Sequence, residues 1–238
     1  IPSTLTAEEI LIRSGNIGSI KIAQKIGLEN FKKFLDDLDL LKKTQFDIEE
    51  VGSPIPFKWG KCKLATSAYG HGITTTPLQL AKGYAIIANG GHKIKPTLIK
   101  KDQNKKKGEQ MITKENSKKI NKILRKIVTS EQGTANLVNI NGYEIAGKTG
   151  TAQKSIKGKY SKKKINTFVS IFPISHPKYV LVVLLDEPKL SKNYVYKYND
   201  NGKELKIVGT PFNTAGWTSV EVAKNIIEKI GPILAIKY

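Results

Sequence analysis

The sequence predicts an α+β fold in which an antiparallel β-sheet is flanked by helices. Three observations lead to this prediction. Apolar residues recur at helical spacing through most of the first 130 residues. From residue 143 the pattern changes to short runs of strand-forming residues, and over residues 222–230 it returns to helical spacing. A chain of 238 residues can bury a stable core without disulfide bonds, so we expect one domain over residues 1–238.

The first helices are marked by their start and stop signals. Thr6 and Glu9 have the spacing of a capping box, so a helix is predicted to begin at Thr6. Turn-prone residues 13–16 interrupt it. A second amphipathic helix then runs to Gly27, which can cap it, and a third is expected over residues 31–38.

The middle of the chain is predicted to alternate irregular and helical segments. Residues 44–73 are rich in Gly, Pro and Thr and are expected to be irregular. Thr76-Pro77 opens a helix that the glycines 90–91 stop. A lysine-rich loop is expected over residues 100–109 and an amphipathic helix over residues 112–129.

Strands are predicted in the last third. Residues 143–153 are expected to form a strand that leads into a basic loop over residues 154–164. Residues 167–174 and 178–186 then predict a hairpin, and residues 222–230 form the apolar face of a closing helix.

The chain is strongly basic, with a formal net charge of +20. Of its 40 basic residues only Arg13 and Arg125 are arginines, although arginine is favoured for base readout and bidentate phosphate contacts. Because the lysines are spread along the chain, we expect a solvated surface suited to an anionic cell envelope, and no nucleic-acid partner. A lysine-rich nucleic-acid binder is the alternative.

Cysteine and histidine are too sparse to suggest a disulfide or a metal site. Lone Cys62 excludes an intramolecular disulfide. His71, His92 and His176 have no ligand-like spacing, so neither a metal nor a cofactor is expected.

Candidate chemistry concentrates in Lys148-Thr149-Gly150-Thr151 at the start of the predicted strand. An ammonium and two hydroxyls can hold a carboxylate and an oxyanion. Gly150 lets a substrate lie against the strand backbone, where a side chain would obstruct it. The alternative interpretation is a surface hairpin with a solvated lysine.

A second candidate is Ser14-Gly15-Asn16, in the turn between the first two helices. Ser14 can relay a proton and Asn16 can bond a substrate amide. The alternative is an ordinary turn, since all three residue types favour turns. We predict that this triplet and the Lys148 strand line opposite walls of one cleft.

Several blocks of the sequence, taken together, resemble the class B penicillin-binding proteins, and the end of the chain is similar to the septal, division-specific members. The Lys-Thr-Gly and Ser-X-Asn elements are two of the three signatures of serine penicillin-binding proteins. The matching blocks occur in the family's order and cover residues 11–18, 21–27, 69–85, 88–91, 133–135, 146–153, 214–218 and 230–236.

The resemblance implies a peptidoglycan D,D-transpeptidase with the serine β-lactamase and penicillin-binding transpeptidase fold. In that family a serine attacks the D-Ala-D-Ala bond of a stem peptide, and an amine of a neighbouring strand resolves the acyl-enzyme. Ser14 would then relay protons and Asn16 would orient the substrate, while Lys148 tunes the electrostatics. Thr149, Gly150 and Thr151 would bind the substrate, with the Thr151 amide in an oxyanion hole.

The resemblance also implies partners and a location. β-Lactams would bind in place of the stem peptide, and divisome membrane proteins would contact the full-length parent. The expected location is the periplasmic face of the bacterial inner membrane, with the membrane anchor outside this chain.

The third signature, the Ser-X-X-Lys nucleophile, is absent from its usual place before Ser14. The two such strings, at residues 161–164 and 175–178, follow Lys148 and fall in the predicted basic loop and hairpin turn. We therefore expect residues 1–238 to be the C-terminal portion of a single transpeptidase domain, incomplete at the N-terminus and inactive alone.

Three alternatives remain at this point. A serine β-lactamase shares the fold and the Lys148 strand. A non-catalytic relative could bind β-lactams or serve as a divisome scaffold. At His71 a general-base role competes with a structural role in a loop.

Overall fold

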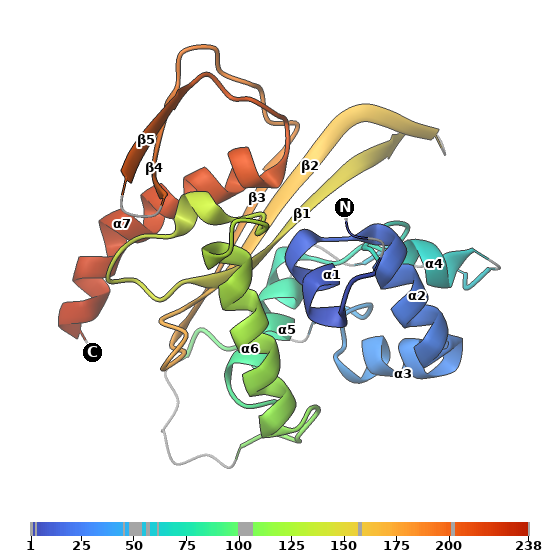
Figure 1. Cartoon of the computed structure of the whole chain (residues 1–238). Coiled ribbons are helices and arrows are strands. Elements are labelled where there is room, and N and C mark those ends of the chain that lie inside the picture. Colours follow the sequence, from blue (N-terminus) through green and yellow to red (C-terminus); the bar gives the residue numbers. More distant parts are fainter. Residues whose placement is uncertain are drawn as a thin grey trace. The chain divides into compact units, whose positions relative to one another are not determined.

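A computed structural model describes the chain except residues 1, 3, 45, 48–53, 56–57, 61, 100–106, 157–158, 201–202 and 238 (Figure 1). The chain divides into two compact units. The first comprises Ile1–Leu11 and Gly15–Asn121, and the second comprises Ile12–Ser14 and Lys122–Tyr238.

The first helices follow the predicted signals. α1 spans Ala7–Arg13, α2 spans Asn16–Ile26 and α3 spans Leu28–Asp37. Thr6 and Glu9 form the expected capping box, since the Glu9 amide donates to Thr6 Oγ1 at 3.2 Å and the Thr6 amide donates to the Glu9 carboxylate at 2.7 Å. Gly27 ends α2 in a left-handed conformation (φ 86°) that a glycine adopts without strain.

Residues 44–73 contain a helix that the sequence analysis missed. α4 spans Lys63–Ser67, too short to show a helical period in the sequence, so the prediction of irregular structure is wrong there. α5 spans Pro77–Ala88 and carries the predicted N-cap, with Thr76 and Gln79 in a reciprocal capping box. α6 spans Lys114–Thr129. Most of the predicted loop at 100–109 lies outside the described residues.

A buried ion pair fixes α5 in the first unit. The Lys82 side chain is only 7% exposed and donates to Asp39 Oδ2 at 3.0 Å, while Lys93 reaches the same oxygen at 2.8 Å. Burial raises the pKa of the Asp39 carboxyl, but the hydrogen bonds from the two ammonium groups outweigh it and hold that pKa below its ordinary value. Removing either lysine would therefore leave a partly buried charge less well compensated.

The second unit is built on an antiparallel sheet of three strands in the order β1-β2-β3. β1 spans Ala146–Ile156, β2 spans Lys159–Phe172 and β3 spans Tyr179–Asp186. The predicted β2–β3 hairpin is confirmed. With α7 it confirms the α+β class. Among the residues that the structure describes, β1 is an edge strand of this sheet and pairs with β2 alone.

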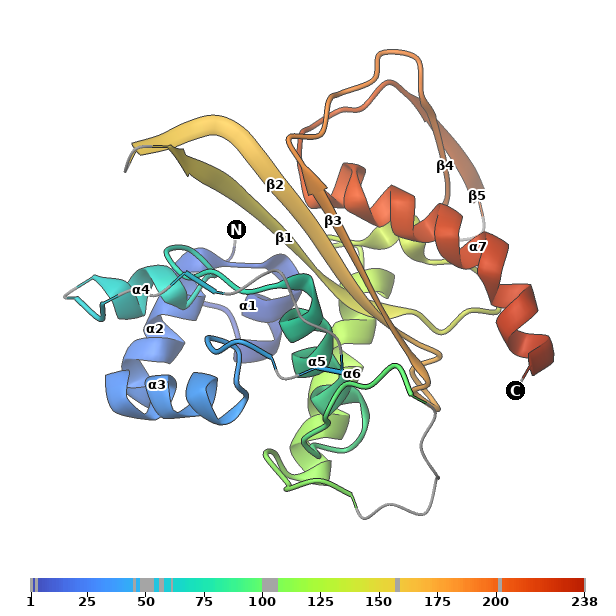
Figure 2. The ribbon, with the colours of Figure 1, turned by 180° about the vertical axis from the view of Figure 1, so that it is seen from behind.

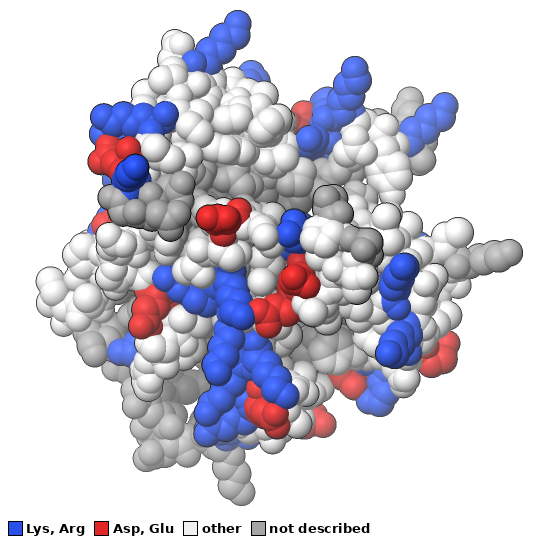
Figure 3. Space-filling view, in the orientation of Figure 1, with Lys and Arg blue, Asp and Glu red and all other residues white. Residues whose placement is uncertain are grey.

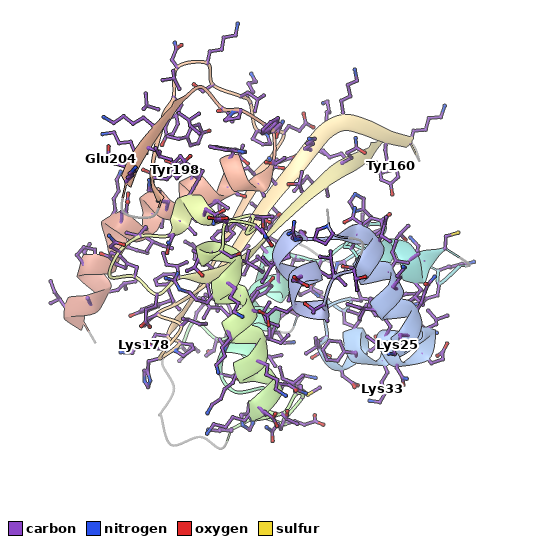
Figure 4. The ribbon with its side chains drawn as sticks, in the orientation of Figure 1. Lys25, Lys33, Tyr160, Lys178, Tyr198 and Glu204 are labelled. Carbon is purple, nitrogen blue, oxygen red and sulfur yellow. The ribbon has the colours of Figure 1, made fainter. Side chains whose placement is uncertain are left out.

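The prediction of a basic loop over residues 154–164 is wrong. β1 and β2 continue through it as a long hairpin, and Tyr160, labelled in Figure 4, lies near its end. The lysines are tolerated there because carboxylates pair with them. Lys154 lies 2.9 Å from both Asp186 and Glu187, and Lys163 lies 3.0 Å from Glu187.

A two-stranded ribbon and a long helix complete the second unit. The ribbon consists of β4 (Val195–Asp200) and β5 (Lys203–Val208), neither of which was predicted. α7 spans Ser219–Lys237 and confirms the predicted closing helix. Figures 1 and 2 show the ribbon lying over α7, and the short 3₁₀ helix η2 (Ala215–Trp217) leads into α7.

The core of the second unit lies between the sheet, α7 and the end of α6. Gly147 is required there, because an added Cβ would lie 2.5 Å from the Val169 carbonyl oxygen and 2.6 Å from the Phe168 ring. The fully buried apolar side chains of this core include Ile127, Ile145, Phe168, Ile171, Val220, Ala223 and Ile227.

The lysine-rich surface is most evident along α6, where Figure 3 shows basic side chains gathered with a few acidic ones between them. Among the described helices, none combines the length and the apolar character needed to cross a membrane.

Candidate active site

The second unit brings together Ser14 and Lys148, which are 134 residues apart in the sequence. Lys148 Nζ donates to Ser14 Oγ at 2.7 Å and to the Thr149 carbonyl at 3.1 Å. Ser14 lies in the turn after α1 with φ at 58°, a left-handed conformation that costs free energy in a residue with a Cβ. The turn thereby directs the hydroxyl to the lysine.

Burial tunes the Lys148 ammonium. Lys148 is partly buried, and desolvation lowers its pKa from 10.5 to about 8. A lysine with this pKa gains and loses a proton near neutral pH. Because Ser14 Oγ is its direct hydrogen-bond partner, the pair can pass a proton between a nitrogen and a hydroxyl.

The two threonine hydroxyls are held in place by neighbouring segments. Thr149 and Thr151 are two residues apart on β1, so they share one face of the strand. Thr149 Oγ1 lies 2.6 Å from Thr134 Oγ1, and Thr151 Oγ1 accepts a hydrogen bond from the Ala215 amide at 2.9 Å. The Thr151 O–H, and one of the Thr134 and Thr149 O–H groups, therefore remain donors for a carboxylate.

Gly150 keeps the open edge of β1 accessible. It is exposed, and an added Cβ would meet only the Thr167 carbonyl oxygen, at 4.0 Å. Packing therefore does not require a glycine at this position. Since β1 is an edge strand of its sheet, an extended peptide could add beside it through backbone hydrogen bonds.

Two further segments, at Thr134 and at Ala215, support these threonines. Thr134 and Ala215 supply the two contacts described above. Gly216 permits their close approach, because a Cβ there would lie 2.7 Å from the Thr134 carbonyl oxygen. The sequence offered one signal for these two residues, since both fall within blocks that resemble the family.

Asn16 and His71 belong to the first unit. Asn16 is exposed and begins α2. Because it belongs to the first unit, it is not among the residues that the second unit brings together. Its substrate-orienting role remains a prediction. The His71 ring lies 5.0 Å from the Tyr69 ring.

The two Ser-X-X-Lys strings lie on the β2–β3 hairpin. Ser161 and Lys164 are three residues apart on β2, so their side chains start on opposite faces. Lys164 Nζ donates to the Asn213 carbonyl at 2.9 Å. Ser175 lies in the turn before β3, where its amide donates to the Glu144 carboxylate at 3.1 Å. Among the described residues, no group of three or more His, Cys, Asp or Glu side chains could hold a metal ion.

Comparison with known proteins identifies relatives over nearly the whole chain. The family model "Penicillin binding protein transpeptidase domain" matches residues 1–207. The "Probable peptidoglycan D,D-transpeptidase FtsI" of Caulobacter vibrioides is 28% identical over 246 residues, covering 99% of this chain and 39% of that protein.

Solved structures share the fold, and the predicted transpeptidase-like fold is thereby confirmed. The apo transpeptidase domain of penicillin-binding protein 3 from Burkholderia pseudomallei has a TM-score of 0.76 and 24% identity, covering 95% of this chain and 65% of that one. Penicillin-binding protein 3 from Mycobacterium tuberculosis, complexed with aztreonam, has a TM-score of 0.75 and 24% identity, covering 95% and 52%. This chain thus spans less than two thirds of each of these proteins.

Proposed function

Because the chain belongs to the penicillin-binding protein transpeptidase domain family, we propose that it forms the substrate-binding and proton-transfer part of a peptidoglycan D,D-transpeptidase. The observation that carries the proposal is the hydrogen bond of 2.7 Å between Lys148 Nζ and Ser14 Oγ, beside the open edge of β1. This hydrogen bond joins the desolvated Lys148 side chain to the Ser14 hydroxyl, beside the strand whose threonine hydroxyls can act as donors.

The donor stem peptide would lie along β1. Its terminal carboxylate would accept hydrogen bonds from the Thr149 and Thr151 hydroxyls, whose oxygens Thr134 and Ala215 hold in position. The peptide would extend over Gly150, where no side chain obstructs it. The Thr151 amide would donate to the oxyanion of the tetrahedral intermediate.

Ser14 and Lys148 would carry the proton. When a serine gives its proton to its own base and its oxygen bonds the penultimate D-Ala carbonyl carbon, the C–N bond to the terminal D-Ala breaks and the departing amine needs a proton. Ser14 can donate it and recover a proton from the Lys148 ammonium, whose pKa of about 8 keeps this exchange feasible near neutral pH. The same pair can take a proton from the acceptor amine that resolves the ester.

We propose further that the acylated serine is not among residues 1–238. In the Ser161–Lys164 string, Lys164 Nζ donates to the Asn213 carbonyl, and Ser161 Oγ accepts a hydrogen bond of 3.2 Å from the Lys163 amide rather than from Lys164. A nucleophilic serine needs its base within hydrogen-bond reach. Incubation of the chain with fluorescent penicillin is therefore expected to give no covalent band, with the full-length Caulobacter relative as the positive control. A covalent band on this chain would overturn this part of the proposal.

The binding part of the proposal is tested without acylation. N-acetyl-D-alanyl-D-alanine should shift the backbone NMR resonances of Thr149, Gly150 and Thr151, whereas N-acetyl-L-alanyl-L-alanine should not. Thr151→Val removes one hydroxyl donor and should weaken the D,D response at least about 5-fold, the loss of one hydrogen bond. Equal responses to the two enantiomers would contradict a D,D site.

The location and partners follow from the proposed substrate. Stem peptides lie outside the cytoplasm, so we propose the periplasmic face of the inner membrane, with β-lactams as ligands and divisome membrane proteins as partners. Crosslinking of cells followed by co-purification would test this location. Divisome membrane proteins should co-purify when the crosslinker reaches the periplasm and should be lost when it does not.

A further inference from the structure

A cavity in the second unit, apart from the β1 edge, has the features of a ligand site. Its volume of about 410 Å³ lies within the range of small-molecule sites, about 300–1,000 Å³. It lies between β4, η2 and α7. The lining residues that matter are Lys189, Tyr194, Tyr196, Trp217, Glu221 and Lys229.

Aromatic rings form one wall of this cavity. The Tyr194 and Tyr196 ring centroids are 4.8 Å apart, and those of Tyr196 and Trp217 are 5.2 Å apart, both pairs close to edge-on. Tyr196 is 3% exposed, and its hydroxyl is hydrogen-bonded to Thr210 and to the Trp217 carbonyl, both at 2.8 Å. The hydrogen-bonded Tyr196 therefore fixes a rigid wall against which an apolar group or a cation could pack.

The buried carboxylate of Glu221 is only half satisfied. Glu221 is 7% exposed. Its Oε1 accepts from the Tyr194 hydroxyl at 2.8 Å and from Asn225 Nδ2 at 3.3 Å, whereas Oε2 is buried without a hydrogen-bond partner among the described residues. An unpartnered buried acceptor is costly, so the site lacks a hydrogen-bond donor.

Two lysines give the same cavity a positive mouth. Lys189 and Lys229 line it and are exposed, whereas Glu221 lies inside. A bare cation would be repelled at the mouth, and a bare carboxylate would leave Glu221 unsatisfied. A molecule with both charges meets complementary groups at each end.

We propose that this cavity binds an amino-acid-like zwitterion with an apolar side chain. Its ammonium donates to Glu221, its side chain packs against Trp217 and Tyr194, and its carboxylate faces Lys189 and Lys229. The site is separate from the β1 edge and goes beyond the transpeptidase proposal. η2 contacts both sites, because Trp217 lines the cavity and the Ala215 amide donates to Thr151 Oγ1.

Three matched probes test the proposal on the full chain of residues 1–238: phenylalanine, phenethylamine without the carboxylate, and 3-phenylpropionate without the amine. Trp59→Phe leaves Trp217 as the single tryptophan, because the chain has two, so fluorescence reports on this cavity. Phenylalanine is expected to bind most tightly and 3-phenylpropionate at least about 10-fold more weakly, the loss of one charged hydrogen bond. Excess N-acetyl-D-alanyl-D-alanine, which has no ammonium, should not displace phenylalanine.

A charge-removing pair of variants completes the test. Glu221→Gln keeps the side-chain shape and should weaken phenylalanine about 10-fold or more. Glu228→Gln is the control, because it removes the same charge from the same helix. Glu228 lines a different cavity together with Tyr198 and Glu204 (Figure 4), so this variant should leave the affinity for phenylalanine unchanged. Equal affinity for phenylalanine and 3-phenylpropionate would overturn the proposal, even if Glu221→Gln failed to fold. Equal affinity for phenethylamine and phenylalanine would refute the role of the lysines.

Discussion

Replacing Lys148 by methionine should stabilise the protein at neutral pH and lose that advantage in alkali. Desolvation lowers the pKa of Lys148 from 10.5 to about 8, so the folded state binds fewer protons than the unfolded state between these two values. Stability of the wild type therefore rises with pH across this window. A difference of 2.5 pKa units corresponds to about 3 kcal/mol, which is the penalty of keeping the ammonium charged below pH 8.

The variant also loses two hydrogen bonds, to Ser14 Oγ and to the Thr149 carbonyl, each contributing about 1 kcal/mol. At pH 7 the two effects leave Lys148→Met more stable by about 1 kcal/mol. At pH 10 most of the charge penalty has vanished, and the variant should be less stable by about 1 to 2 kcal/mol. The difference between variant and wild type thus changes sign.

Urea unfolding at pH 7, 8, 9 and 10 measures this crossing, with Trp217 fluorescence in a Trp59→Phe background reporting on the second unit. Lys154→Met is the matched control on the same strand. The carboxylates of Asp186 and Glu187 raise the pKa of Lys154, so its removal should destabilise the protein at pH 7. A Lys148→Met difference that stays constant from pH 7 to pH 10 would show that Lys148 keeps an ordinary pKa, and the proton-transfer role would lose its basis.

Two further predictions concern stability. Thr76→Ala removes the N-cap of α5 and one half of its capping box, so urea unfolding should show a loss of about 1 kcal/mol, and Thr76→Ser should restore most of it; an Ala variant as stable as the Ser variant would contradict the cap. Gly147→Ala forces a Cβ to within 2.5 Å of the Val169 carbonyl oxygen and should cost about 1–3 kcal/mol, whereas Gly150→Ala on the same strand meets only an oxygen at 4.0 Å and should cost little. Equal losses for the two glycines would refute the packing argument at Gly147.

The helical half of the fold was predictable because its signals are local. Thr6 and Glu9 form the capping box that the sequence spacing indicated, Thr76 with Pro77 begins α5 as predicted, and Gly27 ends α2 as expected. The strand half was less visible. Lys154 and Lys163 looked like loop residues because the carboxylates that pair with them, Asp186 and Glu187, lie far along the chain.

The candidate site shows the same division between local and distant information. The strand edge at Lys148 and the turn at Ser14 could each be proposed from a few consecutive residues, and the resemblance assigned them roles. The supporting contacts could not be derived, because Thr134 and Ala215 reach the threonines only once distant segments have packed. The half-satisfied Glu221 had no signal either, since a glutamate in the first turn of a helix is an ordinary stabilising choice.

Two local costs at the candidate site converge on one contact. Ser14 holds a left-handed backbone, a conformation that costs about 1–3 kcal/mol outside glycine, and Lys148 keeps an ammonium in a desolvated position. A glycine at position 14 would relieve the first cost and a methionine at position 148 would relieve the second. Each relief would also remove the hydrogen bond of 2.7 Å that joins the two side chains. Since stability at neutral pH would favour both replacements, the two costs support the proposed proton-transfer role, in which a titratable nitrogen contacts a hydroxyl beside an open strand edge.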